Sequence, residues 1–314
     1  MSLEPRTVIV ASPRGFCAGV SYAVEIVDLV LQRYGAPVYV RHEIVHNRHV
    51  VENLRAKGAV FVDDLALVPP ESLLIFSAHG VSPAVREEAK ARQLRVIDAT
   101  CPLVTKVHLQ VLRHVREGNV VIMIGHRGHV EVEGTMGHAP ERMHLVEKVE
   151  DVAKLRVDDP DRLAVVTQTT LSVDDTRDII EALRARFPNI RTPPKDDICY
   201  ATQNRQAAVK ALAKEADVVL VIGSPTSSNA NRLVEVARNE RTTAHLIETV
   251  ESIDPTKLGT AHCVGVTSGA STPEVLVQET VARLQRLGFT TVRDLEIVEE
   301  HVTFPLPREL RSGA

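Results

Sequence analysis

Short apolar runs rich in Val and Ile alternate along the chain with segments whose apolar residues recur at helical spacing. The runs predicted to be strands are residues 7–11, 37–40, 59–62, 73–76, 95–98, 120–124, 144–146, 163–167, 218–222, 245–247 and 263–266. The predicted helices include residues 104–116, 205–214 and 274–287. Alternation of strands and helices is typical of parallel sheets covered by helices, so the pattern predicts an α/β fold.

The polar positions repeat in the same order three times. Each repeat begins with a cysteine at a predicted helix start, and these are Cys17, Cys101 and Cys199. A strand then runs into a middle polar loop (residues 40–47, 125–131 and 223–229), and a later strand runs into a second polar loop (residues 77–82, 167–172 and 267–272). The repeat predicts three similar α/β units at residues 1–100, 101–196 and 197–287, followed by a C-terminal tail at 288–314.

The loops of this repeat are expected at the carboxyl ends of strands, where parallel sheets bind their ligands. If the three units pack around a pseudo-threefold axis, these loops meet at one central cavity. A simpler interpretation is that any α/β chain cycles through strand, loop and helix, with small polar residues as helix caps. That interpretation accounts for Ser82, Ser172 and Thr272, but not for one cysteine at the same phase of every unit.

The composition excludes several classes of protein. The 314 residues carry 37 Lys and Arg against 41 Asp and Glu, a formal net charge of −4, so a general nucleic-acid binder with a basic face is not expected. Trp is absent, which argues against stacking platforms for bases. The chain lacks an apolar run long enough to cross a membrane and a basic, apolar leader, so we expect a cytoplasmic protein without membrane contact.

The three repeated cysteines are candidate metal ligands. In a cytoplasmic protein, four cysteines are not expected to form structural disulfides. A helix N-terminus favours the thiolate, which is the form that binds metal. Three isolated thiolates suit either a zinc site completed by a histidine or an iron–sulfur cluster with one iron left open, and the close cysteine pairs usual for structural zinc are absent. Cys263 lies inside a predicted strand and is expected to be a small core residue.

Polar side chains in the loops suit an anionic ligand. Residues 125–131 place two histidines and Glu131 on a glycine-containing turn, and a carboxyl beside a metal in a closed cavity can act as a general acid. Ser227, Ser228 and Asn229 open a helix and offer hydroxyl, amide and backbone N–H donors, as phosphate sites do. Helix capping and a solvated turn are the simpler explanations. The loops together predict a cavity for a phosphate or diphosphate.

The motifs together resemble one enzyme family, the LytB (IspH) family of 4-hydroxy-3-methylbut-2-enyl diphosphate reductases. The resemblance rests on PRGFCAGV at residues 13–20 and on residues 40–47, 76–81, 98–108, 130–137, 167–175, 195–201, 227–229 and 265–271. These stretches extend from about residue 8 to residue 287. The departures from the family pattern lie in linkers, such as residues 137–144 and 239–244.

The resemblance implies a trefoil of three α/β units around a central 4Fe-4S cluster, which can also be found in a 3Fe-4S form. Cys17, Cys101 and Cys199 match the cluster ligands, and Glu131 matches the proton-delivering acid. Residues that match substrate contacts are His46, His79, His129, Thr169, Ser227, Ser228, Asn229 and Ser271. The implied partners are an allylic diphosphate substrate and ferredoxin or flavodoxin as the electron donor, acting on a monomer.

The activity implied by the resemblance is the last step of the methylerythritol phosphate route to isoprenoids. The substrate, (E)-4-hydroxy-3-methylbut-2-enyl diphosphate, takes up two electrons and two protons, loses water, and gives isopentenyl and dimethylallyl diphosphates. Three alternatives remain open: a zinc hydrolase that uses residues 125–131, a non-enzymatic iron–sulfur carrier or redox sensor, and a sugar-phosphate-binding domain whose cysteines belong to the core.

Overall fold

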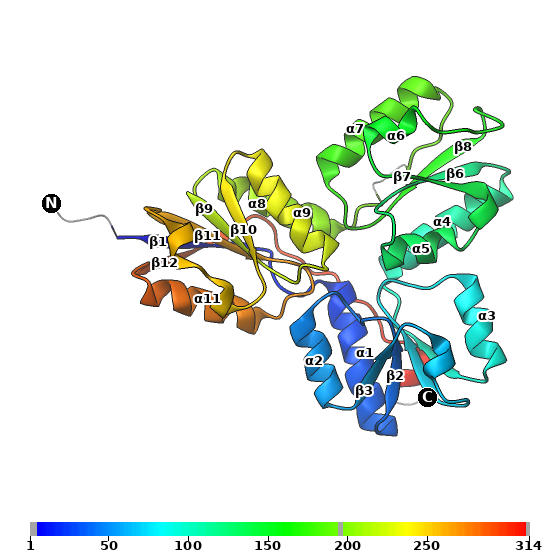
Figure 1. Cartoon of the computed structure of the whole chain (residues 1–314), viewed down its shortest axis with the longest axis horizontal. Helices are drawn as coiled ribbons and strands as arrows, with labels where there is room; N and C mark the ends of the chain where they lie inside the picture. Colours follow the sequence, from blue (N-terminus) through cyan, green and yellow to red (C-terminus); the bar gives the residue numbers. More distant parts are fainter. Residues whose placement is uncertain (1–4, 194–196, 312–314) are drawn as a thin grey trace. The chain divides into compact units, whose positions relative to one another are not determined.

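The computed structural model of the chain describes residues 5–193 and 197–311, and its strands lie in three parallel sheets (Figure 1). The chain divides into two units. Unit 1 consists of the described residues within 1–18, 46–50 and 200–302. Unit 2 consists of the described residues within 19–45, 51–199 and 303–314. The predicted α/β class with parallel sheets is confirmed.

Unit 1 contains a five-stranded sheet in the order β10-β9-β11-β1-β12. Its strands are β1 (Thr7–Ser12), β9 (Val218–Ile222), β10 (Thr243–Ile247), β11 (Cys263–Ser268) and β12 (Thr291–Glu296). Its helices are α8 (Tyr200–Ala213), α9 (Ser228–Asn239), α10 (Pro255–Leu258) and α11 (Glu274–Arg286). Helix α11 packs on one face of the sheet, and α8 and α9 pack on the other.

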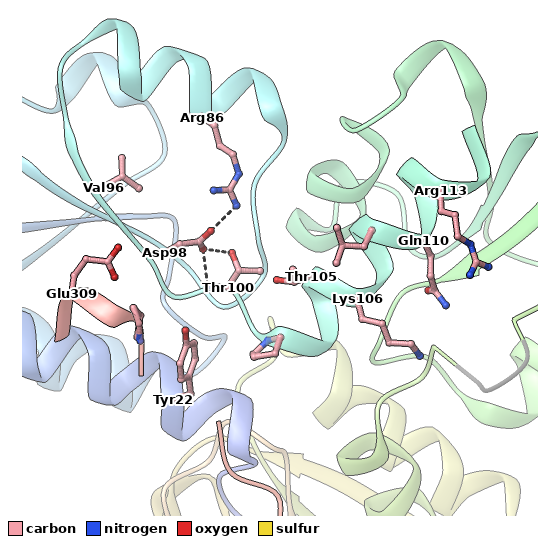
Figure 2. Close-up of a pocket in the computed structure, with 13 residues that line it drawn as sticks. Tyr22, Arg86, Val96, Asp98, Thr100, Thr105, Lys106, Gln110, Arg113 and Glu309 are labelled. Atoms are coloured by element: carbon pink, nitrogen blue, oxygen red, sulfur yellow. Dashed lines mark hydrogen bonds and ion pairs between the residues drawn. The ribbon is translucent and has the colours of Figure 1, made fainter. Parts of the chain in front are cut away.

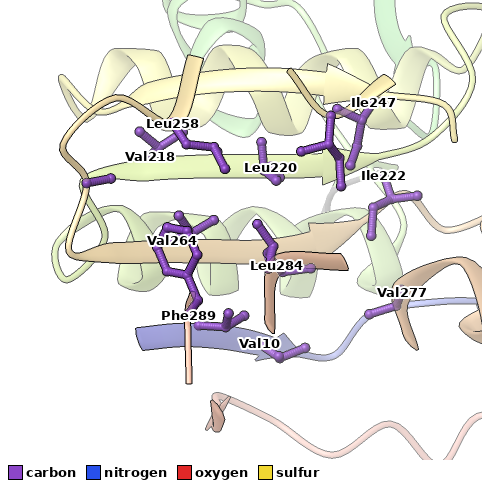
Figure 3. Packing of buried hydrophobic residues seen from close by; sticks show 14 of the residues in the cluster. Val10, Val218, Leu220, Ile222, Ile247, Leu258, Val264, Val277, Leu284 and Phe289 are labelled. Carbon is purple, nitrogen blue, oxygen red and sulfur yellow. The ribbon is translucent and has the colours of Figure 1, made fainter. Parts of the chain in front are cut away.

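The central strands of this sheet are apolar at every position because both faces are covered. Val218, Leu220 and Ile222 of β9 join the core under α11, as Figure 3 shows. Val219 and Val221, at the alternate positions, join the core under α8 and α9. The two-residue period of a strand thus divides one continuous apolar run between two cores.

Unit 2 contains two parallel sheets. The first, in the order β3-β2-β4-β5, has the strands β2 (Val38–Arg41), β3 (Ala59–Val62), β4 (Leu73–Phe76) and β5 (Arg95–Asp98). The second, in the order β7-β6-β8, has the strands β6 (Val120–Ile124), β7 (Met143–Val146) and β8 (Leu163–Thr167). The helices that belong mainly or wholly to this unit are α1 (Ala18–Tyr34), α2 (Arg48–Ala56), α3 (Pro83–Ala91), α4 (Pro102–Arg116), α5 (Val130–Met136), α6 (Val149–Val152) and α7 (Val173–Arg186).

The strand pairing differs from the predicted unit bounds at two places. Strand β1, placed in the predicted first unit, pairs with β11 and β12. Strand β12 comes from the segment 288–314, which was predicted to be a tail. Five of the six residues of β12 are exposed, so the apolar pattern that revealed the other strands is missing there. The division of the chain into units at residues 1–100, 101–196 and 197–287, with a tail at 288–314, stays a prediction.

The local elements follow the sequence pattern closely. All eleven predicted runs are strands, and the predicted helices correspond to α4, α8 and α11. Each predicted middle and late loop follows the carboxyl end of a strand, namely β2, β4, β6, β8, β9 and β11. Within the described ranges, the helices are too short or too polar to cross a membrane.

Candidate active site

Glu131 is a buried acid in the first turn of α5, held by two hydrogen bonds from one residue. Its side chain is 3% exposed. The backbone N–H of Thr169 donates to Oε1 at 2.7 Å, and the Thr169 hydroxyl donates to Oε2 at 3.0 Å. Glu131 follows β6 and Thr169 follows β8, which is the neighbouring strand of the same sheet. The carboxyl ends of two adjacent strands therefore bring these two predicted site residues together.

Burial raises the pKa of Glu131 to about 7, although the two hydrogen bonds from Thr169 act in the opposite direction. Removing a carboxylate from water disfavours its charged form, and this effect is larger than the gain from the two donors. A carboxyl with this pKa holds its proton in much of the population near neutral pH. It can therefore release a proton to a departing oxygen and recover it afterwards.

His129 caps the helix that carries Glu131. Its Nδ1 accepts a hydrogen bond from the backbone N–H of Glu131 at 3.2 Å. Because Nδ1 acts as the acceptor, the neutral imidazole carries its proton on Nε2. Capping therefore sets the tautomer and leaves Nε2–H as the donor for another group.

His79 lies between His129 and His42 in unit 2. Its ring centroid is 6.1 Å from that of each neighbour, in edge-to-face orientation. The loop that carries His79 turns at Gly80, where φ is +76° and a Cβ would lie 2.6 Å from Cε1 of the buried His108. Glycine at residue 80 therefore lets this loop pack closely on α4.

Two of the candidate cysteines join this group through their backbones. Cys101 donates its N–H to the carbonyl of Ala78, beside His79, at 3.0 Å. Cys199 donates its N–H to the carbonyl of Thr169, also at 3.0 Å. Unit 2 thus links Cys101, His79, His129, Glu131, Thr169 and Cys199 in one chain of contacts.

All three candidate cysteines stand directly before helices, as predicted. Cys17 precedes α1, Cys101 caps α4 with Pro102 at its first position, and Cys199 precedes α8. All three are half-buried and form no disulfide. Cys263 begins β11 and is a partly buried residue packed against the core beneath α8 and α9, and burial raises the pKa of its thiol. This placement agrees with its predicted packing role.

Unit 1 holds the candidate anion site at the start of α9. Ser227 caps the helix, and its hydroxyl accepts from the N–H of Ala230 at 3.2 Å. Ser228 is the first residue of the helix. Asn229 is 5% exposed, and neither its amide oxygen nor its amide nitrogen has a hydrogen-bond partner among the described residues. An unpaired buried amide costs about 1–3 kcal/mol, so the site is built to be completed by a polar ligand.

The remaining candidate residues of unit 1 are joined through the loop after β11. The Ser271 hydroxyl donates to the carbonyl of His46 at 2.9 Å. Cys17 donates its N–H to the carbonyl of Ala270 at 3.0 Å. One loop therefore supports both the proposed diphosphate contacts and one proposed metal ligand. The three cysteines are divided between the two units, and their meeting at one cluster stays a prediction.

Arg205 is a site residue that the sequence analysis missed. Its side chain is fully buried, and its guanidinium donates to the carbonyl of Gly15 at 2.8 Å and to Glu300 at 3.2 and 3.3 Å. Gly15 lies two residues before Cys17. Arg205 therefore fixes the Cys17 loop to α8 and uses a carboxylate of the C-terminal segment as its counterion.

The comparisons with known proteins identify relatives of this chain over nearly its whole length. Residues 8–285 match the family model described as LytB protein. A 4-hydroxy-3-methylbut-2-enyl diphosphate reductase of Azoarcus sp. is 60% identical over 311 residues, which are 99% of this chain and 100% of that protein. A protein of Burkholderia mallei, named 4-hydroxy-3-methylbut-2-enyl diphosphate reductase 2, is 59% identical over 96% of this chain and 93% of its own length.

Two solved structures are also similar. One is the E-1-hydroxy-2-methyl-but-2-enyl-4-diphosphate reductase of Plasmodium falciparum, with a TM-score of 0.95 and 43% identity over 98% of this chain and 97% of that one. The other is an (E)-4-hydroxy-3-methyl-but-2-enyl diphosphate reductase described as the terminal enzyme of the non-mevalonate pathway. Its TM-score is 0.63, with 31% identity over 90% of this chain and 99% of that one.

The raised pKa of Glu131 predicts that the folded chain loses stability as pH rises. The carboxyl holds its proton more tightly in the folded chain, where its pKa is about 7, than in the unfolded chain, where it is near 4.5. Its contribution is complete below pH 4.5 and is lost as pH rises to 7, a change of about 3 kcal/mol. Relative to wild type, Glu131→Gln should therefore gain about this much stability across that interval, measured by urea unfolding. Glu133→Gln, on the same helix but exposed, is the control, and an equal pH effect in both variants would contradict the assignment.

Loss of Arg205 should destabilise unit 1 far more than loss of an exposed arginine. Arg205→Gln leaves Glu300 and the Gly15 carbonyl without their cation, and breaking a buried pair costs about 3–5 kcal/mol. Arg293→Gln removes an exposed ion pair with Glu215 in the same unit and should cost about 0–1 kcal/mol. Urea unfolding followed by circular dichroism compares the two. Equal losses of unfolding free energy in the two variants would show that the buried Arg205 contributes no more to stability than an exposed ion pair.

Proposed function

This chain belongs to the LytB family, and on that premise we propose that it is a 4-hydroxy-3-methylbut-2-enyl diphosphate reductase. The reaction cleaves the C–O bond at C4 of (E)-4-hydroxy-3-methylbut-2-enyl diphosphate. Two electrons and two protons enter, one water leaves, and the products are isopentenyl and dimethylallyl diphosphates. The electrons would come from ferredoxin or flavodoxin.

The observation that carries this proposal is the buried carboxyl of Glu131 and its surroundings. An acid with a pKa of about 7 is paired with Thr169, whose carbonyl accepts the N–H of Cys199. Thr169 therefore contacts both the proposed proton donor, Glu131, and a proposed metal ligand, Cys199. Reductive removal of a hydroxyl group needs this combination, because the oxygen leaves as water only when it receives a proton.

The three half-buried cysteines before helices fit an iron–sulfur cluster. None of them forms a disulfide, and they stand directly before α1, α4 and α8. When bound, a 4Fe-4S cluster held by Cys17, Cys101 and Cys199 supplies single electrons and has one iron without a protein ligand. A zinc site in the histidine-rich loop at residues 125–131 is less favoured than the iron–sulfur cluster. Nδ1 of His129 accepts the hydrogen bond that caps α5, so this nitrogen is not available to bind a metal.

The start of α9 fits the diphosphate group. Its twelve residues place the positive end of the helix dipole beside Ser227, Ser228 and Asn229. The Asn229 amide, which has no partner among the described residues, can donate to a phosphate oxygen. The Ser271 hydroxyl donates to the carbonyl of His46 in the same unit, and the imidazole of His46 would contribute a further donor. These contacts would hold the diphosphate and orient the carbon chain without touching the reacting carbon.

The residues of unit 2 would move the proton. Glu131 would donate its proton to the departing oxygen, and the Thr169 hydroxyl, 3.0 Å from Oε2, would hold the carboxyl in position. The Nε2–H of His129 would be a second donor, because its Nδ1 accepts the hydrogen bond from the Glu131 N–H. Burial excludes bulk water, so protons reach the reaction through these side chains.

Metal analysis together with an activity assay tests the proposed function. Protein purified or reconstituted without oxygen should be brown and contain about four irons and four acid-labile sulfides per chain. With dithionite as the reductant, it should convert the hydroxylated diphosphate to the two products. A colourless protein that holds one zinc, or reconstituted protein without diphosphate turnover, would overturn the proposal.

Two variants should separate proton delivery from substrate binding. Glu131→Gln should keep the iron content and the KM while kcat falls by about 100-fold or more, because the acid acts on the departing oxygen. Asn229→Ala should raise KM by about tenfold and leave the iron content unchanged, since one or two hydrogen bonds to a charged group are lost. A near-normal kcat in Glu131→Gln would show that Glu131 is not the acid. An unchanged KM in Asn229→Ala would show that Asn229 does not bind the diphosphate.

A further inference from the structure

Positive charge is concentrated in the part of unit 2 that surrounds Cys101. Residues 83–116, which include α3, β5 and α4, carry seven Lys or Arg against three Asp or Glu. This segment has a net charge of +4, whereas the whole chain has a net charge of −4. A local excess of positive charge on a net-negative protein favours contact with a negatively charged partner.

A groove of about 890 Å³ opens along the same segment (Figure 2). Its wall includes the outer face of α4, where Lys106, Leu109 and Arg113 follow one another at helical spacing. Leu109 is 61% exposed, and the Lys106 and Arg113 side chains are 44% and 59% exposed. The opposite face of α4 packs in the core, so its outer face combines an exposed apolar residue with flanking cations.

The groove reaches the backbone on both sides of Cys101. Thr100 and Pro102, its two chain neighbours, both line the groove. Tyr22 lines it as well, and its pKa is raised by burial and by the nearby charges of Asp98 and Cys101. Cys101 therefore lies in the chain between two residues of the groove wall. A short covalent route through this residue connects the surface to the position of the proposed cluster.

Each cation of the groove has a carboxylate within ion-pair distance. Arg86 pairs with Asp98 at 2.7 Å, and Asp98 also accepts from the Thr100 hydroxyl, as Figure 2 shows. Lys106 lies 3.4 Å from the fully buried side chain of Asp197. Arg113 lies 3.8 Å from Glu117. Fixed side chains lose less conformational entropy when a partner binds, so these cations are preorganised for an interface.

We propose that this groove is the docking surface for a small acidic one-electron carrier protein of the ferredoxin or flavodoxin type. The proposal rests on the proposed function, because the reductase needs a carrier. In each turnover two reduced carriers dock in succession, and each gives one electron through Cys101 and leaves oxidised. The two electrons and two protons cleave the substrate C–O bond and release water. The surface suits a transient complex, with a small apolar centre at Leu109. Its rim carries three cations, Arg86, Lys106 and Arg113, against the two carboxylates of Asp98 and Glu309, and an excess of positive charge accelerates encounter with an acidic partner.

Charge reversal on α4 tests the surface without touching the proposed site. Arg113→Glu combined with Arg116→Glu reverses two exposed cations and leaves Lys106 and its buried partner intact. With reduced flavodoxin or ferredoxin as the donor, the KM for the carrier should rise about tenfold or more, and its increase with added salt should largely disappear. With dithionite as the donor, kcat and the KM for the diphosphate should stay within about twofold of wild type.

The matched control is Arg162→Glu combined with Arg177→Glu, which makes the same change of charge at exposed positions of unit 2 away from the groove. Its KM for the carrier should stay near the wild-type value. If both double variants behave alike, or if neither changes the KM for the carrier, the docking surface is wrong while the reductase function stands.

Direct binding makes the test independent of turnover. Isothermal titration of wild type with oxidised carrier should give a salt-sensitive Kd, and the α4 double variant should bind at least about tenfold more weakly than the control. Loss of dithionite-driven activity in wild type would overturn the proposed function, but the titration would still decide the surface. Equal binding by both double variants would overturn the surface itself.

Discussion

The burial of one ionisable carboxyl is the constraint on which the site of unit 2 depends. Glu131 is 3% exposed and would be strongly disfavoured as an unpaired anion. The fold meets this constraint with two donors from Thr169 and with a pKa near 7. Because Thr169 also receives the N–H of Cys199, and His129 both caps α5 and faces His79, satisfying the acid fixes the positions of its neighbours.

Helix N-termini are the second recurring device. Cys17, Cys101 and Cys199 stand before α1, α4 and α8, and Ser227 to Asn229 open α9. Each of these groups either carries negative charge when active or would bind a group that does, so the same helix property serves thiolates and a diphosphate. The parallel sheets place the site loops at strand carboxyl ends, where the following helices begin. The fold thus explains why the polar loops recur in the same order, whereas a cysteine before α1, α4 and α8 is an addition that the fold does not require.

Most of the strands could be predicted because they are buried on both faces. The run Val120–Ile124 contributes alternate residues to two cores, and so it is apolar throughout and stands out from the sequence. Strand β12 is exposed and polar, and the pairing of β1 with β11 joins residues about 250 positions apart, so neither feature leaves a local pattern. The candidate site residues could also be found from the sequence. The proposed chemistry accepts few residue types at each position, just as burial on both faces accepts only apolar ones. The burial of Glu131 and the missing partners of Asn229 depend on packing, which only the structure supplies.

The C-terminal segment shows how a stretch without a motif can still determine a site. It supplies β12 to the edge of the sheet beside β1, the strand that leads to Cys17. It then supplies Glu300, without which the buried charge of Arg205 would lack a counterion and the Gly15 carbonyl would lose its support. Arg205 is indistinguishable in sequence from the surface arginines of other helices, because its function comes from a partner 95 residues away. A buried ion pair of this kind adds little net stability compared with an apolar pair. Its presence beside a proposed metal ligand is better explained by the position it gives the Cys17 loop than by the energy it contributes.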